Sequence, residues 1–284
     1  MKSILAYILT FIIAFSSFAE ISISEKKALL LLNKSTIGNQ WTTKWDLNAP
    51  VTTWYGVTIQ NDKVVAIDLS SNKLSGTLPN EIANLTHLKS LVLFQNEISG
   101  NIPSTIGDLK NLEQLNLSFN KFSGSIPETL SNAASLKSIE LFMNRINGSL
   151  PKSFYKLNKL EVLSLYNNEI SGEIPSEIYQ IKSLKVLQLN SNKITVKLSK
   201  EISNLSSLES LSLFDNKMIG QVPADIEKMN NLKEMNISYN NFNGAISKKL
   251  SNKDALNMTM LNEQGVASVL KIDMFKDKDI VSEE

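Results

Sequence analysis

The chain has 284 residues, which suffices for one or two domains with a sizeable core, and its formal net charge is +1. Its hydrophobic content of 42% excludes an intrinsically disordered chain, and the balanced charge argues against a general nucleic-acid binder. The absence of cysteine excludes disulfides, cysteine metal sites and cysteine nucleophiles.

Residues 1–19 are predicted to be a secretory signal peptide. Lys2 supplies a positive charge, residues 4–15 are almost entirely apolar, and Ser17 and Ala19 place small residues before a cleavage site. The apolar run is shorter than the roughly 20 residues that a membrane-spanning helix needs. We therefore expect a secreted, extracellular protein (periplasmic if bacterial) with no membrane span in the mature chain.

Residues 20–63 are predicted to cap a repeated region that follows them. Ser22 and Glu25 match the S-x-x-E pattern of a capping box, which leads into a short helix expected over residues 26–32. Three tryptophans are expected to pack inside the cap rather than to bind a ligand: Trp41, Trp45 and Trp54.

Residues 64–255 form eight tandem copies of a 24-residue unit, without insertion or deletion. Val64 opens the first copy, and a leucine opens each of the others: Leu88, Leu112, Leu136, Leu160, Leu184, Leu208 and Leu232. This periodicity predicts a solenoid, in which each coil buries its apolar residues against its neighbours.

One copy, residues 160–183, shows the expected path of a coil. Leu163 and Leu165 alternate with outward-facing residues, which predicts a strand that pairs in register with its neighbours as a parallel sheet. Gly172 stands where the chain turns back, and Pro175 fixes the backbone that enters the far side. In every copy an asparagine ends the strand, and its amide is expected to bond backbone groups as a structural ladder: Asn72, Asn96, Asn120, Asn144, Asn168, Asn192, Asn216 and Asn240.

The consensus LxxLxLxxNxxSGxIPxxIxxL resembles the plant-type extracellular leucine-rich repeat of receptor-like kinase ectodomains and polygalacturonase-inhibiting proteins. The resemblance implies an α/β solenoid, a right-handed superhelix with a parallel concave β-sheet and an irregular or 3-10 convex side. It also implies that Trp54-Tyr55-Gly56 belongs to the family's N-terminal cap, whose two cysteines match Thr52 and Ile59 here. The chain thus resembles a cysteine-free version of the family, for which a bacterial origin is one interpretation.

Two copies depart from the consensus. Residues 195–199 (TVKLS) replace the SGxIP turn, and Ile246-Ser247 lacks the proline, so we expect an irregular convex edge at both places. Residues 256–284 are predicted to be a C-terminal cap followed by a charged tail, with residues 256–272 covering the last coil.

Catalysis is not expected. His87 is the sole histidine and no nucleophile motif adjoins it, so a triad or a multi-histidine metal site is disfavoured. The outward carboxylates Asp68 and Glu140 lie three coils apart, about 14 Å, beyond the roughly 5–9.5 Å of glycosidase pairs. Asp215 and Glu234 are separated by on the order of 15 Å. We predict no enzyme, no cofactor and no metal site.

The concave face is the candidate binding surface, because it presents aromatic side chains among small polar ones. The alternative is that these aromatics are family consensus residues that pack against neighbouring coils. The outward columns contain no Lys or Arg, which disfavours nucleic acid and other phosphate-rich ligands. The predicted contact residues are Phe94, Gln114, Asn116, Phe119, Glu140, Phe142, Val162, Tyr166, Gln188, Asn190, Phe214 and Asp215.

Beside these columns the charge alternates in sign at every coil, which predicts ion pairs between neighbouring coils at a solvated edge. This first charge column is Lys89, Glu113, Lys137, Glu161, Lys185, Glu209 and Lys233.

The favoured function is a secreted, non-catalytic recognition protein that binds an extracellular protein or peptide on its concave face. The main alternative is a cell-surface polysaccharide-binding or adhesion protein, which aromatic and amide columns would also suit. Ice binding ranks third, because the column that would need flat ranks of threonine is mixed, and an enzyme ranks last.

Overall fold

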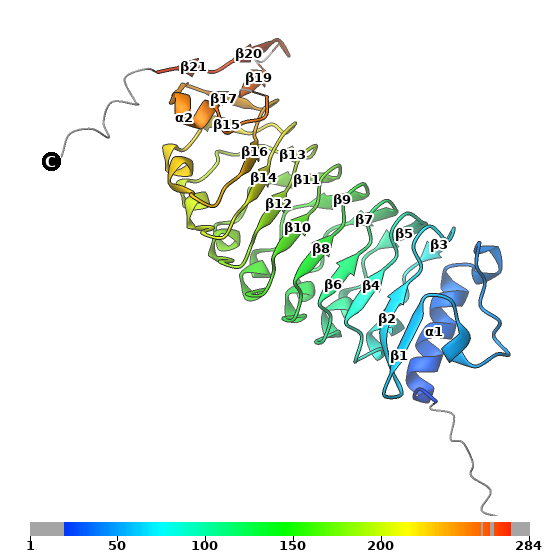
Figure 1. The fold of residues 1–284 in the computed structure, drawn as a ribbon. Helices are drawn as coiled ribbons and strands as arrows, with labels where there is room; N and C mark the ends of the chain where they lie inside the picture. Colours follow the sequence, from blue (N-terminus) through cyan, green and yellow to red (C-terminus); the bar gives the residue numbers. More distant parts are fainter. Residues whose placement is uncertain (1–19, 257, 262–263, 274–284) are drawn as a thin grey trace, which may run out of the picture.

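The computed structural model describes residues 20–256, 258–261 and 264–273. The predicted signal peptide and residues 274–284 of the predicted tail lie outside this range. Successive coils stack side by side from an N-terminal helix to a group of short strands (Figure 1). Among the described residues, no helix has the length and apolarity that crossing a membrane requires.

A nine-stranded sheet runs along the solenoid. β1 pairs with β2 in an antiparallel manner, and every later pair is parallel. Leu163 lies opposite Ile139 and Leu187, each 24 positions away, which confirms the predicted parallel sheet. The strands, in spatial order, are β1 (Val57–Gln60), β2 (Lys63–Asp68), β4 (Ser90–Val92), β6 (Gln114–Asn116), β8 (Ser138–Glu140), β10 (Val162–Ser164), β12 (Val186–Gln188), β14 (Ser210–Ser212) and β16 (Glu234–Asn236).

A second sheet forms where each coil turns away from the first. Gly76 shows why this turn needs glycine: its φ is +100°, and a Cβ there would collide with the Ser35 carbonyl oxygen. This six-stranded parallel sheet comprises β3 (Ser75–Thr77), β5 (Glu97–Asn101), β7 (Lys121–Gly124), β9 (Arg145–Gly148), β11 (Glu169–Gly172) and β13 (Lys193–Ile194).

The first of the two predicted irregularities lies in this second sheet, which stops at the short strand β13, rather than on the far side. Residues 195–199 lack the usual turn, and a separate pair follows, β15 (Ile219–Gln221) with β17 (Asn241–Asn243). A lone bridge from Lys197 to Ile219 keeps the two parts in register. At the second predicted irregularity, the helix α2 (Lys248–Ser251) begins after Ser247 in place of a 3-10 helix.

The far side of the solenoid carries short 3-10 helices, as predicted. Proline precedes η3 to η7 and η9, while η8 begins after Ser199, whose hydroxyl instead accepts a hydrogen bond of 3.2 Å from the Glu201 amide. The far-side helices are η3 (Asn80–Asn84), η4 (Ser104–Asp108), η5 (Glu128–Asn132), η6 (Lys152–Lys156), η7 (Ser176–Gln180), η8 (Lys200–Asn204) and η9 (Ala224–Lys228). Two more 3-10 helices, η1 (Gly38–Gln40) and η2 (Val51–Thr53), precede the first repeat.

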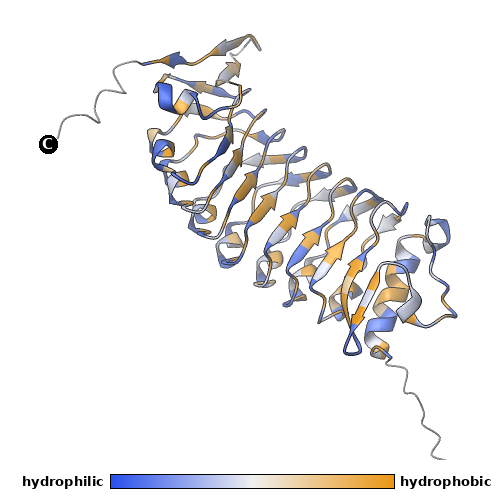
Figure 2. Ribbon diagram, viewed as in Figure 1, coloured by the Kyte–Doolittle hydropathy of each residue, from blue (hydrophilic) through white to orange (hydrophobic). Residues whose placement is uncertain are grey.

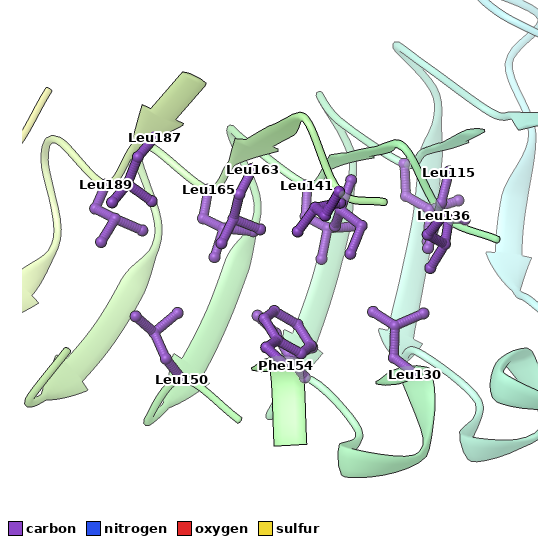
Figure 3. Close-up of a cluster of buried hydrophobic side chains, with 14 of the residues drawn as sticks. Leu115, Leu130, Leu136, Leu141, Leu150, Phe154, Leu163, Leu165, Leu187 and Leu189 are labelled. Atoms are coloured by element: carbon purple, nitrogen blue, oxygen red, sulfur yellow. The ribbon is translucent and has the colours of Figure 1, made fainter. Parts of the chain in front are cut away.

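The core lies between the long sheet and the far side. In Figure 3, Leu163 and Leu165 point from the strand side toward Phe154 and Leu150 on the opposite side, and all four are buried. The apolar colour accordingly concentrates on the strands in Figure 2. Each coil therefore shares one continuous core with its neighbours, which the periodicity requires.

The ladder asparagines tie each coil to the one before it. The Asn168 Nδ2 donates to the carbonyl oxygens of Leu141 and Leu165, both at 3.0 Å, and its Oδ1 accepts from the Ile146 amide at 3.0 Å. The same pattern recurs along the array, for example at Asn192. The backbone amides and carbonyls at the bend thus find hydrogen-bond partners inside the protein.

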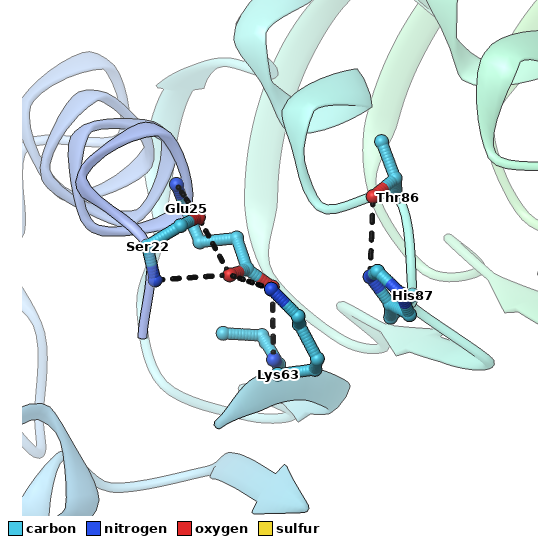
Figure 4. Close-up of polar contacts among 6 residues, drawn as sticks. Ser22, Glu25, Lys63, Thr86 and His87 are labelled. Atoms are coloured by element: carbon cyan, nitrogen blue, oxygen red, sulfur yellow. Dashed lines mark hydrogen bonds and ion pairs between the residues drawn. The ribbon is translucent and has the colours of Figure 1, made fainter. Parts of the chain in front are cut away.

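A buried carboxylate closes the N-terminal end. The helix α1 (Ile23–Ser35) begins with the predicted capping box but extends further in both directions than expected. Glu25 accepts hydrogen bonds from the Ser22 amide at 3.2 Å and from the Val64 amide at 3.1 Å, and Lys63 lies 3.9 Å away (Figure 4). The helix is thereby joined to the first repeat strand. His87, in the same figure, contacts only Thr86 among the residues drawn.

The three tryptophans pack inside the N-terminal cap, as predicted. Trp45 stacks on Trp54 at 4.7 Å and meets Trp41 edge-on at 4.9 Å, and all three are buried. Each indole N–H donates to a backbone carbonyl, those of Thr36 and Tyr55 among them.

Asp254 closes the C-terminal end. Its carboxylate is buried and accepts hydrogen bonds from the amides of Ile237, Leu256 and Met258 and from the Ser238 hydroxyl. The remaining elements are α2 (Lys248–Ser251), β18 (Ala245–Ile246), β19 (Thr259–Leu261), β20 (Ala267–Val269) and β21 (Lys271–Ile272).

The segment after Asp254 covers the last coil only in part. Met258 and Met260 are buried, but Val266, Val269 and Ile272 are exposed. Within residues 256–272, which are predicted to cover the last coil, Met258, Met260 and Leu270 are thus buried while β20 is exposed along its length.

Candidate ligand-binding surface

We define the concave strip as the outward residues of strands β4 to β16 together with the two residues that precede each ladder asparagine. The predicted contact residues all lie on this strip: Gln114, Asn116, Glu140, Val162 and Gln188 on strands, and the others just after them.

Four aromatic side chains from four consecutive coils form a central aromatic cluster: Phe94, Phe119, Phe142 and Tyr166. Phe119 meets Phe94 and Phe142 edge-on at 5.3 and 5.6 Å, and Phe142 stacks on Tyr166 at 4.4 Å with 9° between the ring planes. Phe119 is 40% exposed and forms the outermost part of the cluster. The rings are therefore collected into one surface feature that remains open to solvent.

A second aromatic group lies toward the C-terminus and consists of Phe214 and Tyr239, the C-terminal aromatic pair, 5.1 Å apart. Tyr239 is 37% exposed but is not among the predicted contact residues. Its proximity to Phe214 in the adjacent coil is the signal that could have identified it. Asn190 occupies the coil between the two aromatic groups.

A buried serine lies beneath the central aromatic cluster. Ser118 lies between Phe94 and Phe142 in its column, and those two rings approach to 6.4 Å although two coils are about 10 Å apart. The rings therefore lean together over Ser118, which is 0% exposed. In the described part of the chain its hydroxyl has no hydrogen-bond partner.

Three serines of the outward columns are consequently not accessible, contrary to the simple alternation expected from the sequence. Ser164 is buried and donates to Gln188 at 2.8 Å, and Ser238 is buried against Asp254. Alternation sets which way a residue points, but the larger neighbouring side chains decide whether solvent reaches it.

The residue before each ladder asparagine adopts a left-handed backbone. Phe119 has a φ of 53° and Tyr239 a φ of 57°, a region in which bulky residues are rare. Asn167, at the same position of another coil, is a residue type that tolerates this conformation. Two rings of the strip thus lie at positions whose backbone conformation disfavours bulky residues.

The strip is acidic. Glu140 accepts hydrogen bonds from Asn116 Nδ2 at 3.2 Å and Ser138 Oγ at 3.0 Å, which hold its carboxylate beside the central aromatic cluster. Burial, together with this carboxylate, raises the pKa of the Tyr166 hydroxyl. Asp215, next to Phe214 in the chain, and Glu234, at the start of β16, are also exposed.

The first charge column forms the predicted ion pairs, each between a lysine and the glutamate of the preceding coil. The distances are 2.6 Å for Lys137–Glu113, 2.8 Å for Lys185–Glu161 and 2.6 Å for Lys233–Glu209. The hydrogen bond from Lys137 lowers the pKa of Glu113.

A second charge column, which the sequence analysis missed, follows the ladder asparagines along the other edge of the strip. It contains the pairs Lys121–Glu97 and Lys193–Glu169, both at 2.8 Å. The same 24-residue spacing would have revealed it. Within the described residues, no group of three His, Asp or Glu side chains is arranged to hold a metal ion.

The comparisons with known proteins agree with this geometry. A model of the leucine-rich repeat region matches residues 128–272, and a model of the single leucine-rich repeat matches residues 63–85, 87–109 and 111–133. The chain therefore belongs to the leucine-rich repeat family.

Solved structures of plant receptor ectodomains are similar. That of GASSHO1/SCHENGEN3 from Arabidopsis thaliana, in complex with CASPARIAN STRIP INTEGRITY FACTOR 2, is 34% identical over 68% of this chain and 22% of its own, with a TM-score of 0.62. That of the Arabidopsis receptor kinase HAESA, in complex with an IDA peptide hormone, is 29% identical over 80% of this chain and 39% of its own, with a TM-score of 0.72. The chain thus spans well under half of either ectodomain.

A plant ice-binding protein matches over 90% of this chain and 99% of its own, with a TM-score of 0.62. At 20% identity this match shows the fold alone.

Proposed function

We propose that this chain is an extracellular, non-catalytic recognition protein that binds a protein or peptide on its concave strip. The observation that carries the proposal is the central aromatic cluster, because aromatic side chains are enriched in binding interfaces and the residues that dominate binding energy cluster together. The similarity to ectodomains solved with CASPARIAN STRIP INTEGRITY FACTOR 2 and with an IDA peptide hormone supports a peptide or protein over other ligand classes. The same similarity supports an extracellular location.

The contact residues that we propose are the twelve predicted from the sequence, with Tyr239 added. Glu140, Asn116 and the central aromatic cluster would form one contact region, and Phe214, Asp215 and Tyr239 another. The Asn ladder lies behind the strip, and we assign it no contact with the ligand.

The test is capture of partners from the medium of the producing cells by the purified chain, followed by binding measurements with each purified candidate. A Phe142→Ser/Tyr166→Ser variant should lose the partner. Serine is suitable because Ser118 and Ser238 occupy the same column in other coils. Tyr155→Ser, which removes a 46% exposed ring from the far side, is the matched control and should bind normally.

A partner that binds the double variant as tightly as the unchanged chain would overturn the proposal. Selective capture of wall polysaccharide on a glycan array, lost in the double variant, would replace the proposed ligand class with the polysaccharide alternative.

A further inference from the structure

The concave strip has two apolar positions rather than one. The central aromatic cluster is centred between the coils of Phe119 and Phe142, and the C-terminal aromatic pair between those of Phe214 and Tyr239. These centres are four coils apart, about 19 Å at about 4.8 Å per coil. An extended peptide rises about 3.3 Å per residue, so it would span this distance with about six residues.

The coil between the two aromatic groups carries no charged side chain on the strip. Beside Val186 it presents three polar residues, Gln188, Asn190 and Ser191, and all four are partly exposed. Amide and hydroxyl groups both donate and accept hydrogen bonds, which suits the backbone of an extended chain laid across them. The surface is therefore suited to two apolar anchors joined by a backbone-bonded segment.

Carboxylates lie beside both anchors. Glu140 is held next to the central aromatic cluster, and Asp215 adjoins Phe214. The nearest cations of the first charge column, such as Lys137 and Lys185, are paired with glutamates. Arg145 and Lys217 lie beyond the ladder asparagines, off the strip.

We propose that the ligand is an extended, cationic peptide segment with two apolar side chains about six residues apart, one on each aromatic group. Its Lys or Arg side chains face Glu140 and Asp215. This inference rests on the proposed function and specifies the ligand class of the same surface. It follows from the complementarity of the acidic strip to positive charge and from the spacing of its two apolar groups.

The probes are labelled synthetic peptides with two tryptophans about three, six or ten positions apart in a Ser/Gly background, flanked by lysine or by glutamate. Fluorescence anisotropy measures their affinity. The lysine peptide with the middle spacing should bind about tenfold or more tightly than the other spacings and than a single-tryptophan peptide. Its glutamate counterpart should bind about tenfold more weakly.

Two variants test whether the preferences for spacing and for charge arise from the concave strip. Phe214→Ser should abolish the preference for spacing, because only one anchor remains. Glu140→Gln/Asp215→Asn should abolish the preference for lysine over glutamate, and asparagine suits the left-handed backbone of residue 215, as it does at Asn167. Thermal melts of each variant confirm that it is folded.

Equal affinity for all spacings and charges, preferences that persist in the variants, or no binding of any peptide would each overturn the inference. The capture experiment is independent of these probes. A partner that is captured by the unchanged chain and lost with Phe142→Ser/Tyr166→Ser would keep the proposed function while the peptide result overturns the inference.

Discussion

Replacement of one ladder asparagine should show how strongly the ladder stabilises the array. In Asn168→Ala, the Ile146 amide loses the Asn168 Oδ1 as its acceptor. The carbonyls of Leu141 and Leu165 each lose one donor but keep another, from Asn144 and Asn192 respectively. The carbonyl of Tyr166 also loses a longer hydrogen bond of 3.4 Å. The change therefore leaves one buried amide unsatisfied and removes three further hydrogen bonds.

The magnitude follows from these contacts. An unsatisfied buried amide costs about 1–3 kcal/mol, and each additional lost hydrogen bond about 0.5–1.5 kcal/mol. Asn168 is 8% exposed, so water reaches the vacated site poorly. We expect Asn168→Ala to lower the free energy of unfolding by about 3 kcal/mol.

The measurement is urea unfolding followed by far-UV circular dichroism, which reports on all coils, whereas tryptophan fluorescence would report only on the N-terminal cap. Asn190→Ala is the matched control, since it removes an asparagine side chain from the strip two residues before a ladder position. Its effect should be within about 0.5 kcal/mol. A loss below that value for Asn168→Ala, or equal effects of the two variants, would show that the ladder contacts do not stabilise the array.

Three further changes test other parts of the structure. Ser118→Ala should be neutral or stabilise the protein by up to about 1 kcal/mol in thermal melts, because it removes a buried hydroxyl without a partner; a clear loss would mean that the hydroxyl is satisfied. Phe119→Asn should change stability by less than about 1 kcal/mol, because asparagine tolerates the left-handed backbone and this gain offsets the lost ring contacts. It should nevertheless weaken binding of a captured partner; unchanged affinity would contradict a role of Phe119 in binding. The lowered pKa of Glu113 means that its pair with Lys137 stabilises the folded chain above the ordinary pKa of 4.5 and ceases to do so as the pH falls through the lowered value. Glu113→Gln should therefore lower the melting temperature at neutral pH, and this difference should shrink as the pH falls below 4.5 and through the lowered pKa. High salt should also reduce the difference; a pH-independent difference would rule out the ion pair as its cause.

The sequence predicted those features that each coil repeats. The strands, the turns at Gly76 and its equivalents, the prolines before the 3-10 helices and the break at residues 195–199 all depend on residue types at fixed positions of one unit. Because each strand residue pairs with the residue 24 positions away, the repeat length fixes the register of the sheet. The repeated pattern was therefore enough to predict the sheet.

Features that depend on contacts between coils were less predictable. The burial of Ser118 requires Phe94 and Phe142 to lean together, and the closure of the last coil depends on Asp254 reaching backbone amides on both sides of it in the sequence. Neither follows from the pattern of a single coil, because the first depends on rings from two different coils and the second on a carboxylate at the end of the array.

The two ends of the array use the same device with different residues. Glu25 accepts the amide of Val64 at the first repeat strand, and Asp254 accepts that of Ile237 after the last. Inside the array a neighbouring coil accepts the hydrogen bonds of such backbone amides. At each end a carboxylate accepts them instead.

The left-handed position before the ladder asparagine holds both polar and bulky side chains. Serine, glutamine, asparagine and aspartate occupy it in five coils, and the bulky side chains Phe119, Met143 and Tyr239 occupy it in the other three. Phe119 and Tyr239 each place a ring in one of the two aromatic groups, so local backbone preference is overridden at both proposed anchors. Sequences depart from local preference chiefly where function requires it, and these two departures favour a role for the rings beyond packing.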